Sequence, residues 1–214
     1  ILKDGWRMYH GDTIPGFPYH PHRGFETITI NKEGWVDHFD SLGATGRFGE
    51  GDVQWMTAGK GVQHSEMFPL IHKDKENPLE IFQVWLNLPK SSKFVEPHFK
   101  MLWNDSIPIL EEQDDKGKRT IVNVIAGSLK DIQAPAPTPD SWAADPENEV
   151  VVLTIKLEAN TSWQLPAAKS VINRSLYFYR GSEMQIEGKS IPSNHSITLQ
   201  ANEAVLLKSG REDC

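Results

Sequence analysis

The sequence is almost without cysteine: Cys214, the last of its 214 residues, is the only one. A single thiol cannot form an intrachain disulfide, so no oxidising compartment is indicated and we expect a cytoplasmic protein. Long apolar runs are also missing, since no stretch approaches the roughly 18 residues that a membrane-spanning helix needs. We therefore expect no membrane partner. The chain opens on Ile1 rather than on methionine, and these expectations allow for a missing N-terminus.

Positive charge is scarce as well. The chain has 22 Lys and Arg against 29 Asp and Glu, a formal net charge of −7, and its longest basic run is Lys118-Arg119. Nonspecific binding to nucleic acid depends on clustered basic side chains, so we expect no direct contact with DNA or RNA. An acidic surface is compatible with a protein partner.

Helical periodicity is rare, whereas strand-like alternation recurs. Phe25–Asn31 and Ile81–Leu88 both alternate apolar and polar residues with the period of two that a half-buried strand requires. The other expected strands are Thr120–Ala126, Val150–Leu157, Leu176–Tyr179, Glu183–Glu187, Ser196–Leu199 and Ala204–Leu207. Many short strands separated by glycine and proline turns predict an all-β barrel or sandwich.

Two segments interrupt this rhythm. Pro108–Lys118 is acidic and turn-prone, which predicts a linker, and Ala134–Asn148 contains four prolines, which predicts a long surface loop. The linker separates a half that is rich in histidine from a half that is poor in it. We therefore predict two β-domains, residues 1–110 and 111–214, each within the usual size range of a domain.

Two histidine-containing doublets are the most specific chemical signal. His20-Pro-His22 begins a strand-like run, and His64-Ser-Glu66 follows forty-two positions after His22. Residues i and i+2 of a strand share a face, so each doublet directs two donors to one point. Three imidazoles and a carboxylate suit a divalent transition metal, whereas a structural zinc site more often uses cysteine. Four protein ligands leave two positions of an octahedral ion open.

The carboxylate donor has two candidates. Glu26 has the same parity as His20 and His22 if the strand is unbroken, but Gly24 makes an irregularity plausible that would rotate Glu26 away. We prefer Glu66 as the ligand. Glu26 is then assigned a structural role or the role of an outer partner to a ligating histidine.

The remaining histidines are isolated, and an isolated histidine is more often an ordinary polar residue than a ligand. That interpretation applies to His10, His72, His98 and His195. His38 lies on a strand-like segment and could form part of a pocket wall, but we favour an ordinary polar role for it as well. Several large side chains near the doublets could line a pocket for a flat aromatic ligand. An equal alternative is that they belong to the ordinary core of the barrel. They are Phe25, Trp55, Met56, Gln83 and Trp85.

Several long blocks resemble the pirin family of the cupin superfamily. They are His20–Thr27, Gly51–Gly59, His64-x-Glu66, Gln83–Leu88 and Val95–Pro97. The resemblance implies two cupin-type β-barrels of the double-stranded β-helix or jelly-roll kind, the first metal-binding and the second metal-free. The chain ends earlier than the family leads one to expect, so the second barrel is allowed to be incomplete. The implied ligands are His20, His22, His64 and Glu66, with Fe²⁺ expected and Mn, Ni, Co, Cu or Zn as alternatives.

The resemblance also implies two classes of function. The first is a quercetin 2,3-dioxygenase activity, in which Glu66 takes the hydroxyl proton of a flavonol-like aromatic substrate. The second is a metal- or redox-dependent regulator that binds a protein partner, as a transcriptional cofactor or a modulator of a metabolic enzyme. A metal-stabilised barrel without activity is a third reading, because fold alone does not fix function. We place the enzyme slightly ahead, because an open-sided metal centre exceeds what a structural role requires.

Overall fold

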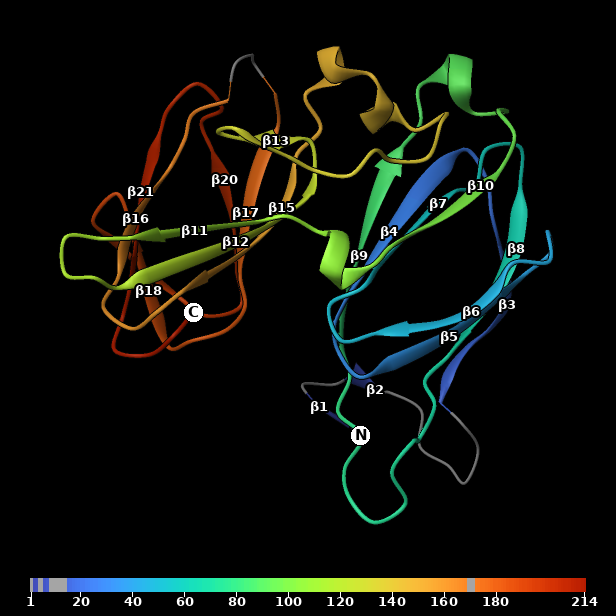
Figure 1. Cartoon of the computed structure of the whole chain (residues 1–214), viewed down its shortest axis with the longest axis horizontal. Helices are drawn as coiled ribbons and strands as arrows, with labels where there is room; N and C mark the ends of the chain where they lie inside the picture. Colours follow the sequence, from blue (N-terminus) through green and yellow to red (C-terminus); the bar gives the residue numbers. More distant parts are fainter. Residues whose placement is uncertain (1, 4–5, 8–14, 169–171) are drawn as a thin grey trace. The chain divides into compact units, whose positions relative to one another are not determined.

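The computed structural model describes residues 2–3, 6–7, 15–168 and 172–214. These residues form antiparallel β-strands (Figure 1), and their helical pieces are short 3-10 turns. Packing groups the chain into two compact units: unit 1 is residues 1–106 with 135–145, and unit 2 is residues 107–134 with 146–214. No helix among the described residues has both the length and the apolar character needed to cross a membrane.

Unit 1 contains two four-stranded antiparallel sheets. The first has the order β3 (Gly16–His22), β8 (Val62–Met67), β5 (Trp35–Asp40), β6 (Thr45–Gly49). The second has the order β10 (His98–Leu102), β7 (Val53–Thr57), β4 (Phe25–Glu33), β9 (Glu80–Asn87). The smaller elements are β1 (Leu2–Lys3), which pairs with β2 (Trp6–Arg7), and the turns η1 (Lys90–Ser92) and η2 (Asn104–Ser106). This is an all-β arrangement of the jelly-roll kind, as the sequence predicts.

Strand β4 lies at the centre of unit 1 and is buried along most of its length. Ile28 and Ile30 alternate with Thr27, Thr29 and Asn31, so one face of the strand is apolar and the other is polar. On the polar face, Thr29 accepts a hydrogen bond of 3.1 Å from the amide of Gln83 on the adjacent strand β9. A polar row therefore runs through the interior of this unit.

Unit 2 is also built from antiparallel strands. Its larger sheets have the orders β11 (Ile109–Gln113), β12 (Arg119–Ala126), β15 (Val152–Leu157) and β16 (Ser162–Leu165), β21 (Val205–Ser209), β18 (Glu183–Ile186), β19 (Lys189–Pro192). The remaining pairs are β17 (Arg174–Phe178) with β20 (His195–Leu199) and β13 (Ser128–Leu129) with β14 (Ile132–Gln133), and η4 spans Pro146–Asn148. Its core includes Val122, Leu157, Trp163 and Leu207.

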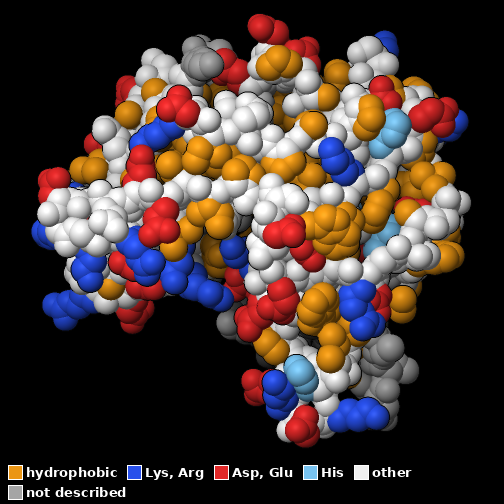
Figure 2. Space-filling view, viewed as in Figure 1, with side chains coloured by type: hydrophobic (Ala, Val, Ile, Leu, Met, Phe, Trp, Pro, Cys, Tyr) orange, Lys and Arg blue, Asp and Glu red, His pale blue; other side chains and the backbone are white. Residues whose placement is uncertain are grey.

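Basic and acidic side chains are interspersed on the surface of unit 2 (Figure 2). Arg119 pairs with Glu158 at 2.7 Å, and Lys156 pairs with Asp213 at 3.2 Å. Both pairs are largely exposed, so each contributes little to stability.

The predicted linker Pro108–Lys118 is wrong, because Ile109–Gln113 forms strand β11 and pairs with β12. Although it is acidic, this segment is a strand with one face directed toward the core of unit 2. Leu110 packs against the core of unit 2, and Glu112 accepts a hydrogen bond of 2.7 Å from the indole of Trp163 and pairs with Lys130. Glutamate has a low β-propensity, but partners of this kind make it compatible with a strand.

The segment 134–148, predicted as a long surface loop, lacks strands but is partly buried, and it contains the turns η3 (Trp142–Ala144) and η4. Its residues 135–145 form a separate piece of unit 1, although they follow unit 2 strands in sequence. Thr138 and Ser141 are buried there, and the hydroxyls of Thr57 and Thr138 lie 2.5 Å apart. The division into domains 1–110 and 111–214 stays a prediction.

Candidate metal centre

Three histidines converge in the first sheet of unit 1. His20 on β3 lies directly opposite His64 on β8, and His22 is the next residue on the same face of β3. The Nε2 atom of His22 lies 3.0 Å from that of His20 and 2.8 Å from that of His64, and the remaining Nε2 pair is 3.0 Å apart. Three imidazole nitrogens thus surround one point.

A hydrogen bond on the side of the His20 ring that faces away from the other histidines determines which nitrogen carries its proton. Nδ1 lies 2.7 Å from the carbonyl oxygen of Pro18, which can only accept a hydrogen bond. Nδ1 therefore carries the proton, and Nε2 presents a lone pair to the other two histidines. The β3–β8 register shifts between Phe17 and His20, which places the Pro18 carbonyl within reach of the ring.

A buried pair on β5 backs His64. Nδ1 of His64 lies 3.4 Å from Nδ1 of His38, and Nε2 of His38 lies 3.0 Å from a carboxylate oxygen of Asp40. The sequence suggested His38 only as a less favoured pocket-wall candidate and did not single out Asp40. Alternation along Asp37-His38-Phe39-Asp40 puts both residues on one face, but the register that brings them to His64 is visible only in the fold.

Burial lowers the pKa of three histidines in this region. Burial and the neighbouring His20 lower the pKa of His22 to about 4. Burial and the histidines around it lower the pKa of His64 to about 3, against an opposing effect of Asp40. Burial also lowers the pKa of His38, and Asp40 partly offsets this. His22 and His64 are consequently neutral at neutral pH, the state in which imidazole binds a metal.

The three nitrogens fit a metal ion. Lone pairs that face each other at 3.0 Å repel unless a cation lies between them. Three ligands about 2.1 Å from an ion and at right angles to one another would lie about 3.0 Å apart, close to the separations here. The donor atoms of His20, His22 and His64 all lie within 4.8 Å of one another. No thiolate is present among them, which suits iron, nickel, manganese or copper better than structural zinc.

Glu66 lies two residues after His64 on β8 and is buried. Its carboxylate does not belong to the group of donor atoms, from His20, His22 and His64, that lie within 4.8 Å of one another. Its Oε1 has no hydrogen-bond partner among the described residues, whereas Gln83 donates to the carboxylate. Burial raises the pKa of Glu66, and the nearby His20 and the hydrogen bond from Gln83 oppose that shift.

Glu26 occupies a different environment. Its side chain is fully buried, and its two oxygens accept hydrogen bonds of 2.8 to 3.0 Å from Trp55, Thr57, Ser141 and the backbone of Trp142. Gly24, at φ +73°, separates β3 from β4, so the parity of His20 and His22 does not extend to Glu26. Four donors thus bind its two oxygens, and none of these donors is a histidine.

An aromatic shelf, defined as Phe25 and Trp85, adjoins His22. The two ring centroids lie 4.9 Å apart, and that of Phe25 is 4.9 Å from the His22 ring. Trp85 is 64% exposed, which leaves a large flat surface open beside the histidines. Trp55 and Met56, which the sequence also suggested for a pocket, are buried in the core.

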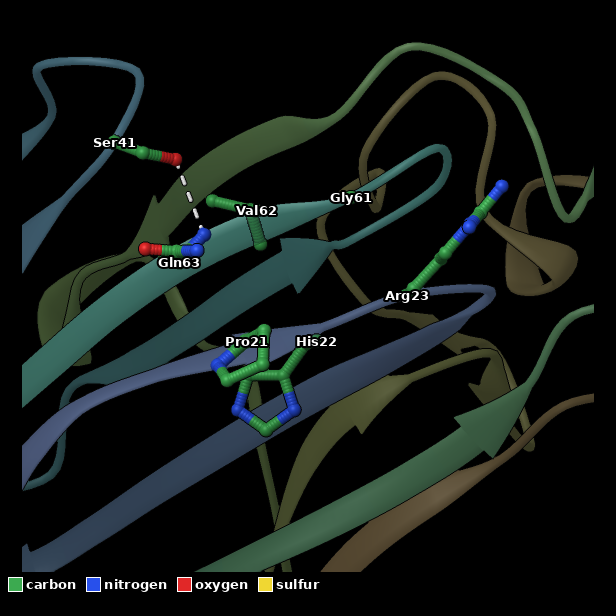
Figure 3. Close-up of a pocket in the computed structure, with 7 residues that line it drawn as sticks. All are labelled: Pro21, His22, Arg23, Ser41, Gly61, Val62 and Gln63. Carbon is green, nitrogen blue, oxygen red and sulfur yellow. Dashed lines mark hydrogen bonds between the residues drawn. The ribbon is translucent and has the colours of Figure 1, made fainter.

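A pocket of about 360 Å³ also reaches His22 (Figure 3). The close-up shows Arg23 directed away from His22, and it shows the Ser41 side chain, which accepts a hydrogen bond of 3.1 Å from the backbone N–H of Gln63. Val62 and Gly61 complete the lining. The pocket is bordered by the β3–β8 pair and does not include the aromatic shelf.

The other histidines lie elsewhere. His98 pairs with Asp140 at 2.6 Å, Nδ1 of His195 lies 3.1 Å from the Ser193 carbonyl, and His72 is exposed. His10 lies outside the described residues. None of the three described side chains belongs to the three-histidine cluster.

An all-β jelly-roll unit that encloses convergent histidines defines a cupin-type protein. The family model described as Pirin matches residues 3–86. A relative from Thermoplasma acidophilum, named "Putative quercetin 2,3-dioxygenase", is 33% identical over 204 residues, which cover 92% of this chain and 73% of that protein. The chain belongs to the pirin family.

Two further comparisons agree. A relative from Pseudomonas aeruginosa that is also named a putative quercetin 2,3-dioxygenase is 45% identical over 123 residues, which cover 58% of this chain and 42% of that protein. The crystal structure of quercetin 2,3-dioxygenase from Acinetobacter baumannii aligns with a TM-score of 0.77 at 28% identity, over 97% of this chain and 68% of that one. The match to the Pseudomonas relative thus spans less than half of its length.

Proposed function

We propose that unit 1 holds one divalent metal ion through His20, His22, His64 and Glu66, with Fe²⁺ as the resident metal and Mn, Ni, Co, Cu or Zn able to replace it. The observation that carries this proposal is the convergence of three Nε2 atoms at 2.8 to 3.0 Å. The unpartnered Oε1 of buried Glu66 supports the fourth ligand. A buried carboxylate oxygen without a donor is costly unless another partner, such as a cation, satisfies it.

We further propose that the centre serves a quercetin 2,3-dioxygenase-type reaction on a flavonol-like substrate. The names of the relatives, putative quercetin 2,3-dioxygenases, and the aromatic shelf both support this substrate class. The shelf offers Trp85 and Phe25 for stacking against a flat ring system beside His22. When bound, the metal would polarise the substrate's hydroxyl oxygen and lower its pKa, and it would supply the site for O₂ chemistry.

The chain's own residues then have distinct roles. Glu66 takes the substrate's hydroxyl proton, and its raised pKa makes it a better base than an exposed glutamate. Gln83 holds Glu66 by a hydrogen bond and is itself held by Thr29 and Trp85. The buried His64 and His38 keep bulk water away from the inner side of the centre.

The proposal is tested with purified protein loaded anaerobically with Fe²⁺ and then given quercetin and O₂. We expect the long-wavelength absorption band of quercetin to disappear, with one O₂ consumed per flavonol, and both effects to vanish after chelation. Retention of the band with Fe²⁺ and with each of the other metals would contradict the enzymatic role. Failure to retain any metal would contradict the metal centre itself.

A regulatory role is the second candidate, because the outward face of β5 and β8 exposes large apolar residues. Trp35, Phe39 and Met67 are each more than a third exposed, and they alternate with buried residues on their strands. Such a face suits a protein partner. A partner captured only by the metal-loaded protein, together with absence of flavonol turnover, would favour this role. We also retain the proposal that residues 111–214 form a second, metal-free cupin domain, since they contain one histidine, His195.

A further inference from the structure

We propose that His38 and Asp40 form a positioning relay that fixes the proton of His64 on Nδ1 and so keeps its Nε2 free for the metal. This inference rests on the proposed metal centre and adds two residues that do not touch the ion. The relay runs from β5 to β8, which are neighbours in the first sheet of unit 1, with Asp40 opposite His64 in the register.

The relay begins with a carboxylate whose orientation is fixed. Oδ1 of Asp40 accepts hydrogen bonds from the backbone N–H groups of Leu42 and Ala44, at 2.9 and 3.0 Å. Its other oxygen, Oδ2, is thereby left to face Nε2 of His38 at 3.0 Å. The turn between β5 and β6 consequently sets the direction of the carboxylate.

The proton positions follow in sequence. An ionised carboxylate only accepts, so Nε2 of His38 carries the proton and its Nδ1 presents a lone pair. That lone pair faces Nδ1 of His64 at 3.4 Å, so His64 donates from Nδ1 and keeps Nε2 unprotonated. The His38 ring is further held by stacking on Phe99, with centroids 5.0 Å apart and planes 29° from parallel.

The two supported histidines are backed differently. His20 donates to a neutral carbonyl, that of Pro18, whereas His64 donates to an imidazole that is itself bonded to a carboxylate. The hydrogen bonds behind His64 thus end at a carboxylate, whereas the one behind His20 ends at a backbone carbonyl. Outer partners of this kind typically change metal affinity by about 10- to 100-fold.

The substitution Asp40→Asn would invert the relay. The two backbone N–H groups need an acceptor, so the amide oxygen of the new side chain would remain with Leu42 and Ala44. Its NH₂ group would then donate to Nε2 of His38, which would move the His38 proton to Nδ1. His64 would have to accept at Nδ1 and carry its proton on Nε2, where it blocks the metal. An uncharged side chain of the same shape therefore reverses the proton positions.

The experiment compares the unsubstituted chain with Asp40→Asn, His38→Gln and the control Asp37→Asn. Asp37 lies on the same strand but pairs with Arg47 outside the cluster. Proton positions on His64 are measured in the metal-free protein by ¹⁵N-detected imidazole NMR, and Zn²⁺ affinity is measured by competition with a chelator. Thermal unfolding reports the integrity of each metal-free variant.

We expect Asp40→Asn to move the His64 proton to Nε2 and to weaken Zn²⁺ binding by about tenfold or more. His38→Gln retains an acceptor that can face His64, so it should keep the Nδ1 proton and bind Zn²⁺ more tightly than Asp40→Asn does. A folded Asp40→Asn variant with the His64 proton still on Nδ1 would overturn the relay. Absence of Zn²⁺ binding by the unsubstituted chain would instead overturn the proposed metal centre, and the NMR comparison would still decide on the relay.

Discussion

Trp85 donates its indole N–H to the side-chain oxygen of Gln83 at 2.7 Å, two residues earlier on β9. An indole N–H can only donate, so this bond fixes which end of the Gln83 amide faces Trp85. The NH₂ end must then face Thr29 and Glu66, where it donates to both. An exposed aromatic ring therefore determines how the candidate base is held.

Replacement of Gln83 by leucine should weaken the centre without unfolding the protein. Glu66 would lose its donor, and its pKa would rise further because burial would act unopposed by that bond. We expect metal affinity to fall by about tenfold, the scale for loss of an outer partner. Chelator competition checks this, with Gln185→Leu at an exposed position of β18 as the matched control. Equal affinities for the two variants would show that Gln83 does not position Glu66.

Replacement of His64 by alanine should abolish metal retention. The residue supplies the most buried of the three converging nitrogens, and two imidazoles with one carboxylate would remain. We expect affinity to fall by more than about 100-fold, beyond the usual effect of outer partners. Elemental analysis of the purified protein measures this, and His195→Ala in unit 2 is the control. Retained iron in His64→Ala, together with unchanged quercetin turnover, would refute the assignment.

The two candidate carboxylates should respond in opposite ways to substitution by glutamine. In the unsubstituted protein, four donors bond to the carboxylate oxygens of Glu26. Glu26→Gln places an NH₂ group against such donors, which should lower the free energy of unfolding by about 2–4 kcal/mol. It should leave metal content unchanged. Glu66→Gln should lower metal affinity while altering the unfolding temperature less. Calorimetric unfolding of the metal-free proteins and metal analysis separate the two, and a loss of metal from Glu26→Gln would reverse our assignment.

The thiol of Cys214 should react slowly. Burial, with a smaller effect of the adjacent Asp213, raises its pKa to about 11. At pH 8 we therefore expect iodoacetamide to label the folded chain about a hundredfold more slowly than the unfolded chain. Because the folded pKa exceeds the ordinary value of 9.0, the thiol's contribution to stability is present below pH 9 and is lost as pH rises through 11. Equal labelling rates in folded and denatured protein would contradict this environment.

Strands with strong alternation were predictable from sequence. Ile81–Leu88 was expected as a strand and forms β9, displaced by one residue at each end. Its prediction succeeds because the strand has one apolar and one polar face. The acidic β11 escaped prediction because its glutamates find partners, such as Trp163, that lie about fifty residues further along the chain.

The candidate site was predictable only in part. Parity places His20 with His22 and His64 with Glu66, and the fold brings the three histidines together. The partners that back them were not predictable, since the link between His38 and His64 depends on the register of β5 against β8. A histidine followed two residues later by an aspartate was the only local signal.

The segment 135–145 has a consequence for how the chain is made. Glu26 is synthesised early, but two of its four donors, Ser141 and the backbone N–H of Trp142, emerge from the ribosome more than a hundred residues later. Until then its carboxylate lacks half of its partners, so unit 1 cannot reach its final packing while it is the only part translated. A gene fragment that stops at residue 110 would encode the same incomplete state permanently. Expression of the first half alone should therefore yield a less stable protein, unless residues 135–145 are supplied with it.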